Sequence, residues 1–126
     1  MKDSNIKNRS ICSEVLGKEQ QNELLQQISK CIHPGKRIYF VGIGGISMCG
    51  LAELSHSRGV SIAGSDAQSN LRVAYLKKIG IQVFSGHDRN NIISFKPDLV
   101  VYTGAVFADN PELAEARARG IPCVER

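Results

Sequence analysis

Long apolar runs are missing from this 126-residue sequence. No stretch approaches the ~20 apolar residues of a membrane-spanning helix, and the polar start MKDSNIKNRS lacks the apolar core of a signal peptide. Cysteine pairs are also missing, since Cys12, Cys31, Cys49 and Cys123 show no C-x-x-C spacing. We therefore expect reduced thiols in a cytoplasmic protein with no membrane partner.

Clustered positive charge and aromatic residues are scarce as well. The net charge is +4, from 16 Lys and Arg against 12 Asp and Glu, but the basic residues are scattered along the chain. Three Tyr and four Phe offer little surface for stacking on bases. Because a surface that follows phosphates needs gathered cations, we expect no nucleic-acid partner.

The length fits one domain of ordinary size, preceded by a different kind of segment. Residues 1–36 are polar and hold no strand-like run. Within them, LGKEQQNELLQQISKCI has apolar residues at near-helical spacing, which favours one amphipathic helix before the breaker HPGK. We interpret 1–36 as an extension that packs or self-associates, and 37–126 as the domain that binds a ligand.

Short, β-branched apolar segments alternate with helical segments from residue 37 onward. The expected strands are 38–43, 60–63, 81–84, 99–102 and 121–124. Gly59, Gly80 and Gly120 each precede a strand, where glycine can take the left-handed conformation that ends a helix. This repeated unit predicts an α/β fold with a Rossmann-like, doubly wound parallel sheet of about five strands.

The segment DNPEL has the pattern of a helix start. Asn110 can cap the helix, Pro111 suits its first position, and Glu112 favours its positive end.

Ligands of such sheets bind beyond the carboxyl ends of the strands. The loop after the first strand, GIGGIS, is close to a dinucleotide fingerprint: Gly42 and Gly44 allow a tight turn and a close backbone approach to phosphate. The last fingerprint position holds Ser47, and an extra glycine stands at Gly45. Backbone N–H groups of 44–47 at a helix start form an anion site that any pyrophosphate can use, so the base and sugar pockets must choose the nucleotide.

Polar residues follow the second and third strands. Ser65 and Asp66 offer an acceptor for a ribose hydroxyl or for the imide N–H of uracil, and His87 could donate to a phosphate or carbonyl oxygen. Simpler interpretations stay open: Asp66 as a turn residue or helix cap, and His87 as a solvated side chain. A hydrolase triad of these three is disfavoured because Ser65 lacks the G-x-S-x-G elbow.

Four motifs together resemble a known family. FVGIGGISMCGLAEL, GSD, GHD and TGAVFADNPELAEARARGIPCVER resemble, in this order and spacing, the N-terminal domain of the Mur ligases from about residue 37 to 126. The resemblance implies that the glycine loop holds the pyrophosphate of UDP-N-acetylmuramate rather than that of NAD. The substrate-binding residues it implies are Gly42, Gly44, Gly45, Ile46, Ser47, Ser65, Asp66, His87, Thr103, Gly104 and Ala105.

The resemblance also implies a parent enzyme of peptidoglycan biosynthesis that forms an amide bond. Such a ligase uses ATP and magnesium to activate the muramyl carboxylate, in a central domain with a P-loop, and a C-terminal domain brings L-alanine. No G-x-x-x-x-G-K-[ST] occurs in this sequence, so we expect no catalytic residue, metal or ATP site in the chain itself. GIGGISM and DNPE fit alanine-adding ligases better than the ligase that recycles ready-made peptides.

Two other functions stay open on the residues alone. An NAD-binding oxidoreductase or redox-sensing domain is favoured by Gly42 and Gly44 and disfavoured by Ser47. A stand-alone regulatory module could keep the fold without the ligand.

Overall fold

The computed structural model describes residues 35–106 and 108–126, in which strands and helices alternate. The predicted helix before HPGK lies outside the described residues. The elements are β1 (Arg37–Val41), α4 (Ile46–Ser57), β2 (Ser61–Asp66), α5 (Leu71–Lys78), β3 (Gln82–Ser85), α6 (Arg89–Phe95), β4 (Leu99–Tyr102), α7 (Pro111–Ala118) and β5 (Cys123–Glu125).

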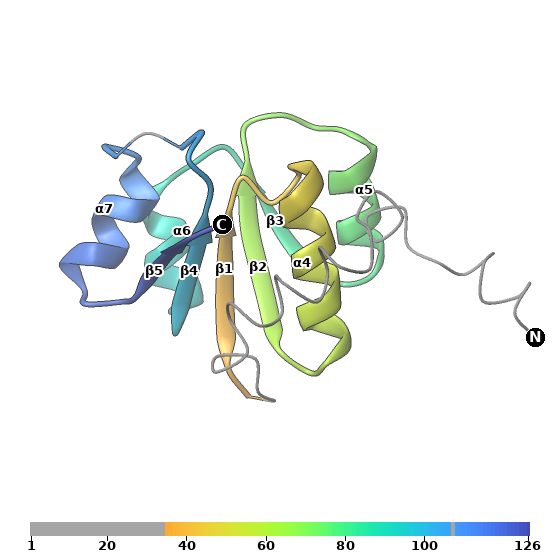
Figure 1. The fold of residues 1–126 in the computed structure, drawn as a ribbon, viewed down its shortest axis with the longest axis horizontal. Helices are drawn as coiled ribbons and strands as arrows, with labels where there is room; N and C mark the ends of the chain where they lie inside the picture. The colour runs from red at the N-terminus through yellow and green to blue at the C-terminus, as the bar shows by residue number, and fades with distance from the viewer. Residues whose placement is uncertain (1–34, 107) are drawn as a thin grey trace, which may run out of the picture.

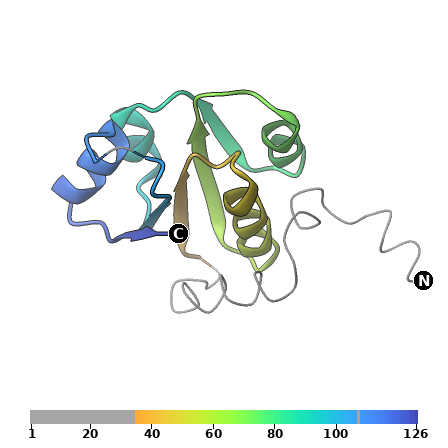
Figure 2. The same cartoon turned by 45° about the horizontal axis from the view of Figure 1, so that its top comes forward.

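The strands form one parallel sheet in the order β3-β2-β1-β4-β5 (Figure 1). Helices α4 and α5 cover one face, and α6 and α7 cover the other, as the turned view makes clear (Figure 2). The chain therefore winds outward from β1 in both directions, and the predicted α/β, doubly wound fold is confirmed. In the described part of the chain, no helix is long and apolar enough to span a bilayer.

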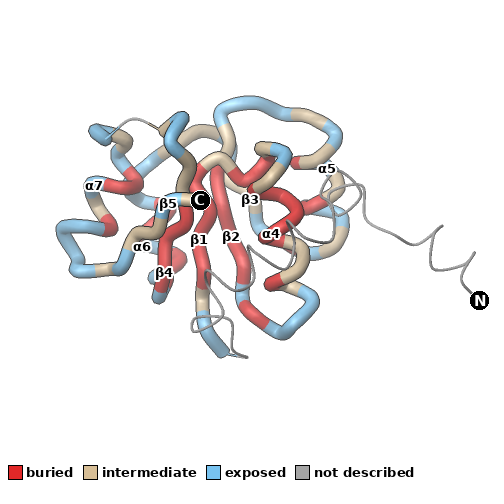
Figure 3. Tube along the Cα trace, in the orientation of Figure 1, coloured by how far each residue is buried: buried red, intermediate tan, exposed pale blue. Residues whose placement is uncertain are grey.

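Strand β1 lies at the centre of the sheet and is covered on both faces (Figure 3). Ile38 and Phe40 pack into the core under α4 and α5, whereas Tyr39 and Val41 pack into the core under α6 and α7. Because side chains alternate between the faces of a strand, a strand buried on both faces needs an unbroken apolar run. That is the pattern by which the sequence predicts this strand.

The ends of β1 and β2 differ from the predicted ends. Strand β1 stops at Val41, because Gly42 turns the chain with a φ of 79°. The N–H groups of Gly42 and Ile43 then both donate to the carbonyl oxygen of Ser65, at 2.8 and 2.9 Å. Strand β2 runs on to Asp66, three residues past its predicted end, so GSD is strand rather than loop.

The predicted glycine turns and the predicted cap of α7 are confirmed. Gly59, Gly80 and Gly120 have φ values of 87°, 100° and 72°. The side chain of Asn110 accepts the N–H groups of Glu112 and Leu113, with Pro111 at the first helical position. Helices α5 and α6 are capped in the same way by Asn70 and Asp88.

Candidate functional site

Helix α4 begins without a side-chain cap. Its N-cap residue is Gly45, and the first bond into the helix runs from the N–H of Cys49 to the carbonyl oxygen of Gly45, at 2.9 Å. The N–H groups of Ile46, Ser47 and Met48 make no hydrogen bond to any described residue. Open donors at the positive end of a helix form an anion site, and this one lies where β1 ends, at the carboxyl edge of the sheet.

The Gly44 peptide is held by protein groups on both sides. Its N–H donates to Oδ2 of Asp66 at 2.8 Å, and its carbonyl oxygen accepts from Nε of Arg72 at 2.6 Å. The N–H of Gly45 bonds to the carbonyl oxygen of Gly42 at 3.1 Å. Four N–H groups, those of residues 44–47, are expected to face a phosphate. Two of them, on Gly44 and Gly45, therefore donate hydrogen bonds within the protein instead.

The close approach at Gly44 is to the protein rather than to a phosphate. A Cβ at this position would lie 2.7 Å from Cγ2 of Val73 and 2.8 Å from Oδ2 of Asp66. Contacts this short do not occur in folded proteins, so only glycine lets the loop pack against β2 and α5. This reason differs from the one the fingerprint suggests.

Asp66 is a turn residue that also holds the glycine loop. Its Oδ1 accepts the N–H of Gln68 at 2.9 Å, while Oδ2 accepts from Gly44. It does not cap α5, because Asn70 does. Asp66 remains half-buried at the rim of a small hollow between β2, α5 and β3, which Val73 and Lys77 also line.

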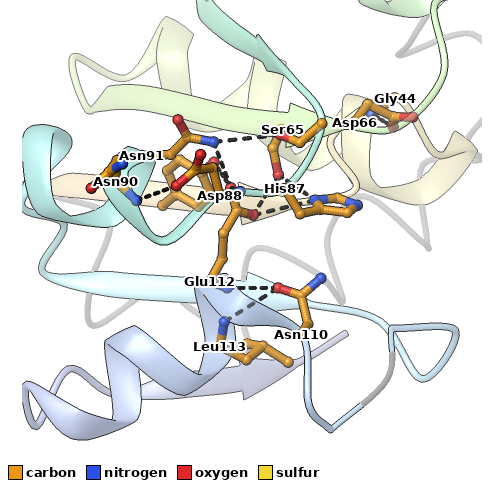
Figure 4. A network of polar contacts seen from close by, with 12 residues as sticks. Gly44, Ser65, Asp66, His87, Asp88, Asn90, Asn91, Asn110, Glu112 and Leu113 are labelled. Atoms are coloured by element: carbon orange, nitrogen blue, oxygen red, sulfur yellow. Dashed lines mark hydrogen bonds and ion pairs between the residues drawn. The ribbon is translucent and has the colours of Figure 1, made fainter.

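Glu112, which the sequence predicts only as a favourable residue at a helix start, lies buried under this edge (Figure 4). Glu112 is 0% exposed. Its Oε2 accepts from the hydroxyl of Tyr39 at 2.5 Å, from the amide of Asn91 at 2.8 Å and from the N–H of Asp88 at 3.3 Å. Burial, together with the negative charge of Glu112, raises the pKa of the Tyr39 phenol far above its usual value.

The other carboxylate oxygen of Glu112 binds two of the predicted site residues. Oε1 accepts from the hydroxyl of Ser65 at 2.5 Å and lies 3.3 Å from Nδ1 of His87. Ser65 Oγ and His87 Nδ1 are themselves 2.8 Å apart. His87 is therefore not simply solvated, and Ser65, which is 0% exposed, is placed to serve this cluster rather than to touch a ligand.

The cluster contains a serine, a histidine and a glutamate, yet it does not have the geometry of a catalytic triad. In a triad, one ring nitrogen faces the nucleophile and the other faces the acid. Here Ser65 and Glu112 both face Nδ1 of His87, and Ser65 has no exposed surface. The arrangement can orient His87, but it cannot deliver a nucleophile to a substrate.

The remaining predicted residues lie along the same edge. Ile46 is 53% exposed at the start of α4, and Ser47 beside it is half-buried. The loop after β4 begins with a turn in which the N–H of Val106 bonds to the carbonyl oxygen of Thr103 at 3.0 Å. Gly104 and Ala105 are exposed, and a Cβ on Gly104 would lie 2.9 Å from Oε2 of Glu125.

Comparison with known proteins assigns the chain to a family. Residues 37–126 match the model of the Mur ligase family, catalytic domain. The chain belongs to the Mur ligase family. It is 48% identical over 90 residues to the UDP-N-acetylmuramate–L-alanine ligase of Bdellovibrio bacteriovorus, covering 71% of this chain and 19% of that protein.

Solved structures of Mur ligases have the same fold. The UDP-N-acetylmuramate–alanine ligase of Thermotoga maritima matches with a TM-score of 0.69 and 43% identity, over 71% of this chain and 20% of that one. The UDP-N-acetylmuramate:L-alanyl-gamma-D-glutamyl-meso-diaminopimelate ligase of Neisseria meningitides matches with a TM-score of 0.66 and 28% identity, over 71% and 28%. The chain spans about a fifth of the length of the curated relatives it matches.

No metal site is apparent in residues 35–106 and 108–126. No group of three His, Cys, Asp or Glu side chains there could hold an ion.

Proposed function

We propose that this chain binds the UDP portion of UDP-N-acetylmuramate as one domain of a cytoplasmic ligase that joins L-alanine to the muramyl carboxylate in peptidoglycan biosynthesis. The observation that carries the proposal is the uncapped start of α4, with three open N–H groups at the carboxyl edge of a Mur ligase fold. ATP and magnesium would act in the central domain of the parent enzyme, and L-alanine would enter from its C-terminal domain.

The charge at the start of α4 and its open hydrogen-bond donors support a position for the pyrophosphate. It would accept from the N–H groups of Ile46, Ser47 and Met48, where the helix dipole favours negative charge. The uracil and ribose would extend toward Asp66 and the hollow between β2, α5 and β3. His87 and the turn from Thr103 to Ala105 would border the sugar.

Alanine addition is favoured over peptide recycling within the family. The solved alanine ligase is 43% identical to this chain, whereas the solved peptide ligase is 28% identical. The two activities would share this first domain, so the preference concerns the parent enzyme rather than the nucleotide site.

The variant Gly45→Asp tests the anion site without removing a packing group. Gly45 has φ −66° and ψ 154°, a conformation open to any residue, and the nearest atom to a Cβ there is 3.4 Å away. An aspartate at this N-cap would accept the open N–H groups and preserve or raise the melting temperature. Because its carboxylate would occupy the place of the pyrophosphate, we expect UDP and UDP-N-acetylmuramate to bind at least about tenfold more weakly in calorimetric titration.

The matched control is Gly45→Ala, which adds the same Cβ without the charge. We expect it to fold as the parent chain does and to keep most of the affinity. Undiminished UDP binding by Gly45→Asp would contradict the proposed pyrophosphate site.

A further inference from the structure

Ser65 connects the glycine loop with the buried cluster. Its backbone carbonyl accepts the N–H groups of Gly42 and Ile43, and its hydroxyl donates to Glu112. The side chain of Ser65 also lies 2.8 Å from Nδ1 of His87. Glu112 therefore contacts the His87 ring, at the edge of the proposed site, both through Ser65 and directly.

The partners of Glu112 determine its chemical form. The amide of Asn91 and the backbone N–H of Asp88 face Oε2, and both groups can only donate. The hydroxyls of Tyr39 and Ser65 complete the set of donors. In the carboxylate form Glu112 accepts from all four of these donors, whereas a proton on either oxygen would displace one of them.

This arrangement fixes the tautomer of His87. Ser65 has one proton and gives it to Glu112, so its oxygen can only accept from Nδ1 of His87. The neutral ring therefore carries its proton on Nδ1. Nδ1–H also points toward Oε1 of Glu112 at 3.3 Å, which favours the same tautomer.

The other ring nitrogen of His87 is turned away from Glu112 (Figure 4). Nε2 has no hydrogen-bond partner within the described ranges, and the side chain is 25% exposed. On the neutral ring this nitrogen accepts a hydrogen bond and cannot donate one. That is the opposite of the donor role expected from the sequence.

We propose that Glu112 is a positioning residue which, by direct contact and through Ser65, presents Nε2 of neutral His87 as a hydrogen-bond acceptor for a hydroxyl group of the nucleotide sugar. The inference rests on the proposed function, because that function supplies the ligand. Hydroxyls of the ribose or of the muramyl unit are suitable donors, whereas ionised phosphate oxygens only accept.

The variant Glu112→Gln should reverse the tautomer with almost no change of shape. Asn91 and Asp88 only donate, so they would hold the amide oxygen of the new glutamine and leave its NH₂ facing Ser65. Ser65 would then accept from that NH₂ and donate to Nδ1 of His87. The proton of the neutral ring would move to Nε2, which would face the ligand hydroxyl as a second donor.

The experiment records ¹⁵N–¹H spectra of the histidine rings of the 126-residue chain in alkaline buffer, where histidine rings are generally neutral. We expect the Nδ1–H form in the parent chain and the Nε2–H form in Glu112→Gln. Calorimetric titration should show UDP-N-acetylmuramate binding about tenfold more weakly to Glu112→Gln, since an acceptor is replaced by a donor. If the hydroxyl belongs to the ribose, Glu112→Gln should also bind UDP about tenfold more weakly, and its affinity for 2′,3′-dideoxy-UDP should fall little.

Two variants separate positioning from simple structural support. Ser65→Ala should keep the Nδ1–H form, because Glu112 can still accept from the ring directly. Glu115→Gln makes the same chemical change on α7 at a half-buried residue that pairs with Arg119 outside the cluster, and should change neither the spectra nor the affinity.

The outcomes distinguish this inference from the proposed function. An unchanged tautomer in Glu112→Gln, or an equal loss of affinity for every ligand including the dideoxy nucleotide, would overturn the role of Glu112. Failure of the parent chain to bind UDP or UDP-N-acetylmuramate would overturn the proposed function and the hydroxyl contact, while the spectra of the ligand-free chain would still decide whether Glu112 sets the tautomer.

Discussion

Tyr39 shows how one hydroxyl in a buried strand supports the edge of the sheet. Its ring stacks near Phe84 with centroids 6.4 Å apart, and its hydroxyl donates to Glu112. Ionisation of this phenol would place a second negative charge beside the carboxylate in a fully buried site. The fold therefore holds Tyr39 in its neutral form.

We predict that Tyr39→Phe lowers the free energy of unfolding by about 1–2 kcal/mol at neutral pH, because Glu112 loses a donor while the ring packing is kept. Burial and the charge of Glu112 raise the pKa of Tyr39 above the usual 10.0, so its stabilising contribution is complete below that pH and is lost as the pH rises further. Urea unfolding from about pH 9 to 11.5 should show the parent chain approaching the variant.

The control is Tyr102→Phe, at a half-buried tyrosine whose ring lies 5.8 Å from the guanidinium of Arg117. It should change stability far less at neutral pH. A gap between Tyr39→Phe and the parent chain that stays constant up to about pH 11.5 would show that the phenol titrates normally.

At the scale of elements, the sequence predicts a strand or a helix cap correctly where that feature depends on neighbouring residues. Strand β4 was predicted at its observed bounds, because four apolar residues between polar ones leave little choice. The cap of α7 was predicted because Asn110 and Pro111 act on their own helix. Strand β2 was predicted too short, because Gly-Ser-Asp is typical of turns and its pairing with β1 depends on distant residues.

The role of Glu112 depends on five residues that lie in other segments, and it could not be derived from its neighbours in sequence. One signal does point to its burial: Glu112 lies four residues before Ala116 and next to Leu113, both buried on the inner face of α7. Its partners Tyr39, Ser65 and Asn91 come from β1, β2 and α6. Only the winding of the sheet brings them together.

We predict that Gly64→Ala disrupts the pairing of β1 with β2. A Cβ on Gly64 would lie 2.6 Å from the carbonyl oxygen of Phe40 and 2.7 Å from the side chain of Ile43. Phe40 and Ile43 are both fully buried, so we expect the free energy of unfolding to fall by about 2–3 kcal/mol. Urea unfolding of Gly45→Ala gives the comparison, because that Cβ meets nothing closer than 3.4 Å; equal stability of the two variants would contradict this account.

At the scale of the whole molecule, the fold could be predicted and the nucleotide could not. Doubly wound sheets bind ligands at their carboxyl edge, where the glycine loop of this chain is the proposed site for pyrophosphate. UDP-sugars and NAD both contain that group. The proposal of UDP therefore rests on the family and on four motifs in order, while the structure shows that the carboxylate of Asp66 accepts the N–H of Gly44.

The last prediction concerns the ligand preference of the 126-residue chain. UDP-N-acetylmuramate at 100 times its dissociation constant should stabilise the fold by ~2.7 kcal/mol and raise the melting temperature by several degrees, because it binds only the folded form. NADH should give a smaller shift, since its adenine has no imide N–H for acceptors near Asp66. ATP should be neither hydrolysed nor strongly bound, because the sequence has no lysine-bearing phosphate loop. Gly45→Asp should lose the shift with UDP-N-acetylmuramate while melting at or above the temperature of the parent chain. An equal shift with NADH, abolished by the same variant, would show that the edge of this sheet holds a pyrophosphate without distinguishing UDP from NAD.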